Sequence, residues 1–192
     1  MQANPGRFAY QVFFHTDEAR VLLDSNVERV VRSIMRASTD EPVAGEDLEF
    51  QSQMYGLEKV TGITKPSSPT ATVSPPSSML TQEDMQVYVS QFTQCGFLNP
   101  IRWYRNVENN WKWNQNIKGK KVTMPSLMVT AENDHILTPS MTKGMDAHCT
   151  QLTIVHVKES SHWIMQQQPQ ECARVMCEWL QKLPIQSATA KL

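Results

Sequence analysis

Hydrophobic positions recur at helical spacing in three stretches of the chain before residue 118. From about Glu18 to Ala37 they follow an i, i+4, i+7 pattern, which predicts one long helix with a single buried stripe. The members of this stripe are Leu23, Val27, Val30, Val31, Ile34 and Met35. The arginines of the segment fall mostly outside the stripe, so we interpret them as a solvated face rather than as an anion site.

Two further helices are predicted downstream. Thr81 is a good N-cap for a helix that ends at Gly96, and Asn99 with Pro100 opens another helix. Their hydrophobic stripes are Met85, Tyr88, Val89 and Phe92, and Trp103, Tyr104, Val107 and Trp111. Aromatic stripes usually pack in a core, so Trp103, Trp111 and Trp113 are expected to be buried. Between the helices, residues 64–79 contain four prolines and five serines, which is typical of a surface loop.

The pattern changes after residue 118. Strands are predicted from Lys121 to Ala131 and from Leu152 to Lys158. Helices are predicted from Thr138 to about His148 and from Gln170 to Leu183. Strand and helix alternate with short links, which predicts an α/β fold with a parallel sheet. We therefore expect a helical lid region at 1–118, part of an α/β core at 119–184 and a polar tail at 185–192.

Polar side chains follow each predicted strand. Asp134 comes after the first strand and His162 after the second. Taken singly, the aspartate is typical of a turn and the histidine, beside Trp163, of a packed core residue. Together they are favoured as a catalytic pair, because both lie beyond carboxyl ends of parallel strands and a general base needs an imidazole oriented by a carboxylate. The sequence contains no Gly-x-Ser-x-Gly elbow and no His-Gly-Gly-Gly or His-Asp-Trp-Gly stretch.

Composition narrows the possible partners and compartments. The chain has 192 residues, a net charge of -1 and no block of basic residues, so nucleic acid is not expected as a partner. No apolar run approaches the ~20 residues of a membrane span. Cys95, Cys149, Cys172 and Cys177 lack metal-ligand spacing, so we expect reduced thiols and no metal. The terminal tripeptide 190–192, Ala-Lys-Leu, follows the pattern of a peroxisomal signal, which predicts peroxisome and cytoplasm as locations.

Several segments resemble the epoxide hydrolase branch of the α/β-hydrolase fold, in particular the carboxy-terminal portion of the soluble (bifunctional) epoxide hydrolases. The matching segments are 8–14, 103–106, 110–113, 127–134 and 161–163. This resemblance implies conversion of lipid or xenobiotic epoxides to vicinal diols through a covalent ester, without a cofactor. It implies that Tyr10 and Tyr104 bind the epoxide oxygen, that His162 activates water and that Asp134 orients His162. It also implies a homodimer of the complete protein.

The chain departs from this family at the attacking carboxylate, which the family carries on a strand-to-helix elbow. Asp17, Asp24 and Asp40 do not follow a strand-like run with a glycine turn, and the oxyanion loop and first strands of the sheet have no counterpart. We therefore expect a truncated or partial form that is inactive and poorly stable alone. Alternatives are a fragment of another α/β-hydrolase, such as an esterase or haloalkane dehalogenase, and an inactive isoform that acts as a binding or dimerisation partner.

Overall fold

A computed structural model of the chain describes residues 8–41, 50–52, 54 and 75–183. The chain divides into two compact units, Met1–Lys118 and Gly119–Leu192. Most of the predicted surface loop at 64–79 and all of the terminal tripeptide at 190–192 lie outside the described residues.

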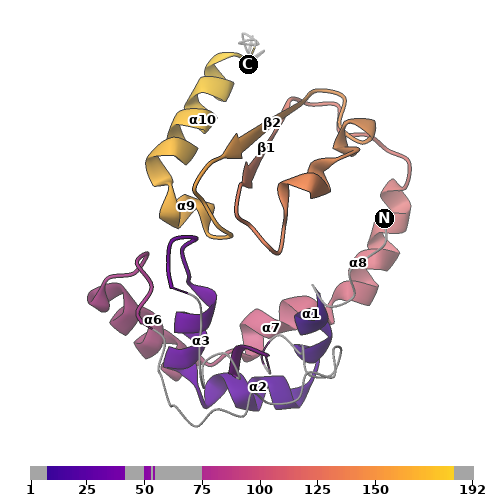
Figure 1. Cartoon of the computed structure of the whole chain (residues 1–192). Helices are drawn as coiled ribbons and strands as arrows, with labels where there is room; N and C mark the ends of the chain where they lie inside the picture. Colours follow the sequence, from indigo (N-terminus) through magenta and orange to yellow (C-terminus); the bar gives the residue numbers. More distant parts are fainter. Residues whose placement is uncertain (1–7, 42–49, 53, 55–74, 184–192) are drawn as a thin grey trace, which may run out of the picture. The chain divides into compact units, whose positions relative to one another are not determined.

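The first unit is helical where it is described (Figure 1). Its elements are α1 (Ala9–Phe13), α2 (Asp17–Asp24), α3 (Val27–Ile34), α6 (Gln82–Cys95), α7 (Leu98–Arg105), α8 (Val107–Asn114) and the short 3-10 helix η1 (Gln115–Ile117). Its core is built mainly from α1, α2, α3 and α7. The buried hydrophobic residues that form this core cluster are Phe13, Phe14, Ala19, Leu23, Val27, Val30, Phe50, Met54, Phe97 and Ile101.

The predicted single helix from 18 to 37 is wrong, because the chain breaks between α2 and α3. Asn26 leaves helical geometry, with φ −136° and ψ 38°, and its side-chain amide donates to the Leu22 carbonyl at 2.8 Å. The Asp24 carboxylate, at the last position of α2, accepts the Phe97 amide at 2.8 Å. A local asparagine contact and a contact with a distant part of the chain therefore end α2 at this point.

The predicted helix after Thr81 is confirmed as α6, and its two ends have clear causes. Thr81 accepts the Asp84 amide and Asp84 accepts the Thr81 amide, which forms a capping box. Gly96 ends α6 with φ +67°. A β-carbon at this position would lie 3.1 Å from the Asp24 carboxylate oxygen, so glycine suits both the backbone angle and the close approach.

The third predicted helix is divided into α7 and α8 at Asn106. The expectation that Trp103, Trp111 and Trp113 are buried is also wrong, because 62% to 76% of their surface is exposed. The buried side of α7 carries Ile101 and the partly buried Tyr104, and no residue of α8 is buried. The tryptophan stripe lies beside the packed face and not on it.

The second unit contains a two-stranded parallel sheet and short helices in its described part (Figure 1). β1 (Ser126–Ala131) pairs with β2 (Leu152–Val157), from Ser126 opposite Leu152 to Ala131 opposite Val157. The other elements are the 3-10 helices η2 (Pro139–Thr142) and η3 (Met145–Ala147), α9 (Ile164–Gln167) and α10 (Pro169–Gln181). The parallel pairing is as predicted, and β1 starts later than expected, after an isolated bridge between Val122 and Cys149.

The predicted helix from 138 to 148 is wrong, because η2 and η3 take its place with Gly144 between them at φ +88°. A left-handed residue interrupts an α-helix at that position. The predicted terminal helix is confirmed as α10, which contacts both strands. Cys172 and Val175 of its predicted stripe are buried, whereas Met176 and Leu180 are exposed.

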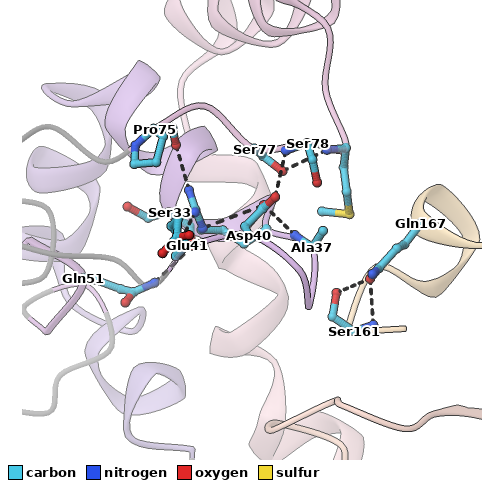
Figure 2. Close-up of polar contacts among 12 residues, drawn as sticks. Ser33, Ala37, Asp40, Glu41, Gln51, Pro75, Ser77, Ser78, Ser161 and Gln167 are labelled. Carbon is cyan, nitrogen blue, oxygen red and sulfur yellow. Dashed lines mark hydrogen bonds and ion pairs between the residues drawn. The ribbon is translucent and has the colours of Figure 1, made fainter. Parts of the chain in front are cut away.

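A buried carboxylate joins the segment after α3 to the last residues of the predicted loop at 64–79 (Figure 2). The Asp40 side chain is 4% exposed, and it accepts the amides of Ala37 at 2.8 Å and Ser78 at 2.9 Å. Arg36 donates to the Pro75 carbonyl at 3.0 Å. Burial disfavours the charged form of Asp40, but these hydrogen bonds and those from the serine hydroxyls outweigh burial, so that the pKa of Asp40 is lowered.

We expect Asp40→Asn to lower the free energy of unfolding by on the order of 2 kcal/mol at about pH 7. Because the pKa of Asp40 is lower in the folded state, its contribution is present above the unfolded pKa of about 3.9 and is lost as the pH falls through the folded pKa. The measurement is thermal unfolding by circular dichroism at about pH 7 and about pH 3. The difference between the variant and the parent should shrink at the lower pH.

The matched control is Glu83→Gln, which removes an exposed carboxylate from the first turn of α6. This change should have a much smaller effect at about pH 7. A stability difference between Asp40→Asn and the parent that stays constant with pH would contradict the assigned role of the ionised carboxylate.

Candidate functional site

The loop after β1 holds Asp134 in one orientation. The Asp134 carboxylate is 7% exposed, and its Oδ1 accepts the amides of Ile136 and Leu137, each at 2.8 Å. These two bonds are local, because the acceptor and donors are two and three residues apart. They occupy one carboxylate oxygen and leave Oδ2 directed to another partner. That partner is His162, whose Nδ1 lies 2.9 Å from Asp134 Oδ2.

The loops after β1 and β2 are joined by backbone hydrogen bonds that continue beyond the strands. Glu132 donates to the Val157 carbonyl at 3.0 Å, and Asn133 donates to the Ser160 carbonyl at 2.9 Å. The Glu159 amide donates to the Glu132 carboxylate at 3.0 Å. Ser160 is fully buried between these contacts. The two loops therefore have a defined spacing, and the segments that carry the acid and the histidine are linked at several points.

The structure thus brings Asp134 and His162 together, as their positions after parallel strands predicted. An ionised carboxylate only accepts hydrogen bonds, so a neutral imidazole at His162 carries its hydrogen on Nδ1 and a lone pair on Nε2. The His162 side chain is 42% exposed, and the ring of Trp163 meets it edge-on at 5.4 Å. An imidazole held in this tautomer beside a buried carboxylate can take a proton from water through Nε2.

The two predicted tyrosines lie together within the first unit. Tyr10 is on α1 and Tyr104 is on α7, and their rings meet edge to face with centroids 5.5 Å apart. Phe14 contacts both rings, at 5.7 Å from Tyr10 and 5.2 Å from Tyr104. The side-chain amide of Gln11 donates to the Tyr10 hydroxyl at 3.3 Å. Two elements distant in the sequence therefore place two phenols side by side at the edge of the helical core.

The Tyr104 phenol is more difficult to ionise than an ordinary tyrosine. Burial is the largest cause, and the nearby charge of ionised Tyr10 and a hydrogen bond with Tyr10 act in the same direction, so the pKa of Tyr104 is raised. An ordinary tyrosine has a pKa of about 10, so Tyr104 remains protonated at neutral pH. This phenol can act as a hydrogen-bond donor to an oxygen that becomes negative during a reaction.

Some residues around this site had no clear sequence signal. Glu132, which links the two loops, is recognisable only as a polar residue directly after a strand. Ser161 and Gln167 form a side-chain contact next to His162 that hydrophobic spacing does not predict. Among the described residues, no group of histidine, cysteine, aspartate and glutamate could hold a metal ion. In the same part of the chain, no helix has the length and hydrophobicity needed to cross a membrane.

Comparison with curated proteins gives relatives that cover almost the whole chain. The bifunctional epoxide hydrolase 2 of Sus scrofa is 34% identical over 182 residues, which is 94% of this chain and 30% of the relative. The corresponding Rattus norvegicus protein is 34% identical over 188 residues, which is 96% of this chain and 32% of the relative. The chain is homologous to the epoxide hydrolases. No family model matches it.

The matched region is the carboxy-terminal part of these epoxide hydrolases. The chain spans about a third of the length of these relatives. The predicted relationship to epoxide hydrolases is therefore confirmed.

Solved epoxide hydrolases share the fold. Epoxide hydrolase A from Mycobacterium thermoresistibile aligns with a TM-score of 0.64 at 21% identity, over 92% of this chain and 53% of that protein. A mutant of the Vigna radiata epoxide hydrolase aligns with a TM-score of 0.68 at 22% identity, over 95% of this chain and 56% of that protein. The predicted partial α/β-hydrolase fold is confirmed.

We expect Tyr104→Phe to remove a tyrosine ionisation that occurs above the ordinary pKa of about 10. The folded protein holds this phenolic proton more tightly than the unfolded chain does, because the pKa of Tyr104 is raised. Its stabilising contribution is therefore present below about pH 10 and is lost as the pH rises through the raised pKa. The measurement is the ultraviolet absorbance of tyrosinate. Tyr88→Phe is the control, and an unchanged absorbance change above about pH 10 in Tyr104→Phe would contradict the assignment.

Proposed function

We propose that this chain supplies the water-activating pair and the epoxide-binding tyrosines of an epoxide hydrolase, which converts a small-molecule epoxide to a vicinal diol through a covalent ester. The observation that carries this proposal is the 2.9 Å contact between His162 Nδ1 and buried Asp134 Oδ2. Homology to epoxide hydrolases gives the reaction class. The alternative hydrolases share an acid and a histidine but do not need two neighbouring phenols as donors.

The first proposed step is opening of the epoxide ring. A carboxylate attacks one ring carbon, a carbon–oxygen bond breaks, and negative charge develops on the ring oxygen. Tyr10 and Tyr104 donate hydrogen bonds to this oxygen, and one of them transfers its proton to give a hydroxyl group. A donor that is protonated at neutral pH is required, and the raised pKa of Tyr104 meets this requirement.

The second proposed step is hydrolysis of the ester. His162 Nε2 takes a proton from water, and the resulting hydroxide attacks the ester carbonyl. The tetrahedral intermediate collapses, the diol leaves, and the carboxylate is regenerated. Asp134 stabilises the imidazolium that forms on His162 and keeps Nε2 directed at the water. The proton on the imidazolium then restores the tyrosine that donated in the first step.

The attacking carboxylate is proposed to come from outside these 192 residues. Asp24 accepts the Phe97 amide, Asp40 is buried against Ala37 and Ser78, and Asp17 is paired with Arg105 at 3.2 Å. None of these aspartates follows a strand. We therefore expect the purified chain alone to form no diol from an epoxide, and diol formation by the chain alone would disprove this part of the proposal.

The substrate is proposed to be an apolar epoxide of lipid or xenobiotic type. The rings of Tyr10 and Tyr104 pack against the hydrophobic core of the first unit, and Phe14 contacts both rings. A hydrocarbon substituent on the epoxide suits such an environment, because it loses contact with water when it binds.

A chimera tests the proposed role of His162. This chain replaces the matching carboxy-terminal part of the Sus scrofa bifunctional epoxide hydrolase 2, and diol formation from an aryl epoxide and a fatty-acid epoxide is measured. We expect His162→Ala to lower kcat by about 10²-fold to 10⁴-fold, because the general base is removed. The enzyme should accumulate as the covalent ester, seen as a mass increase equal to that of the epoxide.

His148→Ala is the matched control, because this histidine is exposed and lies outside the proposed site. It should leave the rate of diol formation unchanged. If His162→Ala turns over at the rate of the unmodified chimera, His162 is not the base. If it loses activity without trapping an ester, the covalent pathway is wrong.

Tyr104→Phe in the same chimera separates epoxide opening from ester hydrolysis. Removal of one donor to a developing oxyanion is expected to slow ester formation by about 10²-fold, with no accumulation of ester. Single-turnover mass measurements distinguish this outcome from the His162→Ala outcome. Unchanged ester formation would remove Tyr104 from the mechanism and would favour a hydrolase that does not need a phenol.

A further inference from the structure

The side chain of Gln167 binds two residues, Glu159 and Ser161, of the loop that carries His162. We call these hydrogen bonds the Gln167 clasp. Gln167 lies at the end of α9, and its Oε1 accepts the amide and the hydroxyl of Ser161, each at 2.8 Å. Its Nε2 donates to the Glu159 carbonyl at 3.0 Å. Figure 2 shows the Gln167 and Ser161 side chains pointing toward each other across this turn. One amide group therefore binds the loop on both sides of Ser160.

The clasped loop has a backbone conformation that its sequence does not favour. Glu159 has φ +51°. In the described part of the chain it is the only residue other than glycine with a positive φ. This conformation is unfavourable for a residue with a β-carbon, because the β-carbon comes too close to the following carbonyl oxygen. Contacts at Glu159 compensate for this cost, because its amide binds the Glu132 carboxylate and its carbonyl accepts from Gln167 and Gln168.

His162 depends on this loop for its position. The imidazole is 42% exposed, so packing surrounds it only in part. The Asp134 bond fixes one ring nitrogen, but it does not fix the backbone from which the ring projects. That backbone begins at Ser161, the residue that Gln167 holds through two hydrogen bonds. An imidazole on a loosely held loop would spend less time against the carboxylate.

We infer that Gln167 is a positioning residue for His162: by accepting the amide and the hydroxyl of Ser161, it keeps Nδ1–H of the imidazole on Asp134 and leaves Nε2 available as the base. The catalytic meaning of this inference rests on the proposed function. The inference concerns two properties of His162: its tautomer, and the fraction of time for which its imidazole is hydrogen-bonded to Asp134. Both can be measured without an epoxide and without the attacking carboxylate.

The test is nuclear magnetic resonance of the complete chain labelled with nitrogen-15, with the His162 signals assigned by their loss in His162→Gln. Ring nitrogen shifts report the tautomer, and exchange of the Ser161 amide with solvent reports the clasp. In the parent, His162 should be mainly the Nδ1–H tautomer. In Gln167→Ala, the Ser161 amide should exchange about tenfold faster, and the imidazole should shift toward the Nε2–H tautomer.

Two variants make the test specific. Gln166→Ala removes a neighbouring, exposed glutamine of α9 and should change neither readout. Gln167→Glu keeps an acceptor for the Ser161 amide and hydroxyl but loses the donor to the Glu159 carbonyl. Gln167→Glu should therefore keep the slow Ser161 exchange and the Nδ1–H tautomer, which would be rescue by the conservative variant.

Each outcome has a defined meaning. Faster Ser161 exchange in Gln167→Ala with an unchanged His162 tautomer would overturn the inference, because the clasp would then serve the loop alone. Unchanged exchange and tautomer would overturn it as well. If Gln167→Ala does not fold, as judged by circular dichroism, Gln167→Glu decides: a folded variant that has lost the Nδ1–H tautomer overturns the inference. Failure of the epoxide chimera affects none of these readouts, so the two proposals fail separately.

Discussion

The in-register pairing of β1 with β2 determines where the candidate site lies. Ala131 is opposite Val157, and the hydrogen bonds continue into the loops through Glu132 and Asn133. A shift of one residue would move one loop along the other by about 3.3 Å and turn its side chains to the opposite face of the sheet. The 2.9 Å contact between His162 and Asp134 would then be lost. The backbone hydrogen bonds between the two loops depend on the same register.

A different constraint places the two tyrosines. They come from α1 and α7, which pack on the same hydrophobic core around Leu23, Val30 and Met54. The side chain of Asp24 holds the Phe97 amide, directly before α7 begins, so a hydrogen bond as well as hydrophobic packing sets the position of that helix. In the second unit, side chains on loops are held by hydrogen bonds to one another. In the first unit, side chains on helices are held mainly by burial.

Features that depend on local sequence could be predicted. The Thr81 cap, the Gly96 stop and the parallel strand pair follow from side-chain chemistry and hydrophobic spacing. The meeting of Asp134 and His162 was also predictable, because residues after parallel strands share one edge of a sheet. The catalytic roles of these residues and of the tyrosines remain predictions.

Features that depend on distant contacts were not predictable. The break after α2 involves the Phe97 amide, 73 residues from Asp24. Trp103 is exposed because the side of α7 that carries Ile101 and Tyr104 packs on the core. Helical spacing alone does not distinguish these two neighbouring sides of the helix, because both carry hydrophobic residues. The two 3-10 helices replace a predicted helix because Gly144 takes a left-handed conformation, which hydrophobic periodicity does not reveal. The Gln167 clasp combines a strained residue with an amide eight positions later.

The Asp40 contacts have a consequence for the rate of folding. They join residues far apart in the sequence, because Asp40 binds Ser78 at a separation of 38 positions and Arg36 binds Pro75 at a separation of 39. The entropy cost of bringing two distant segments together precedes the contacts between them. Contacts of this kind favour slower folding of the first unit than helix formation alone would give.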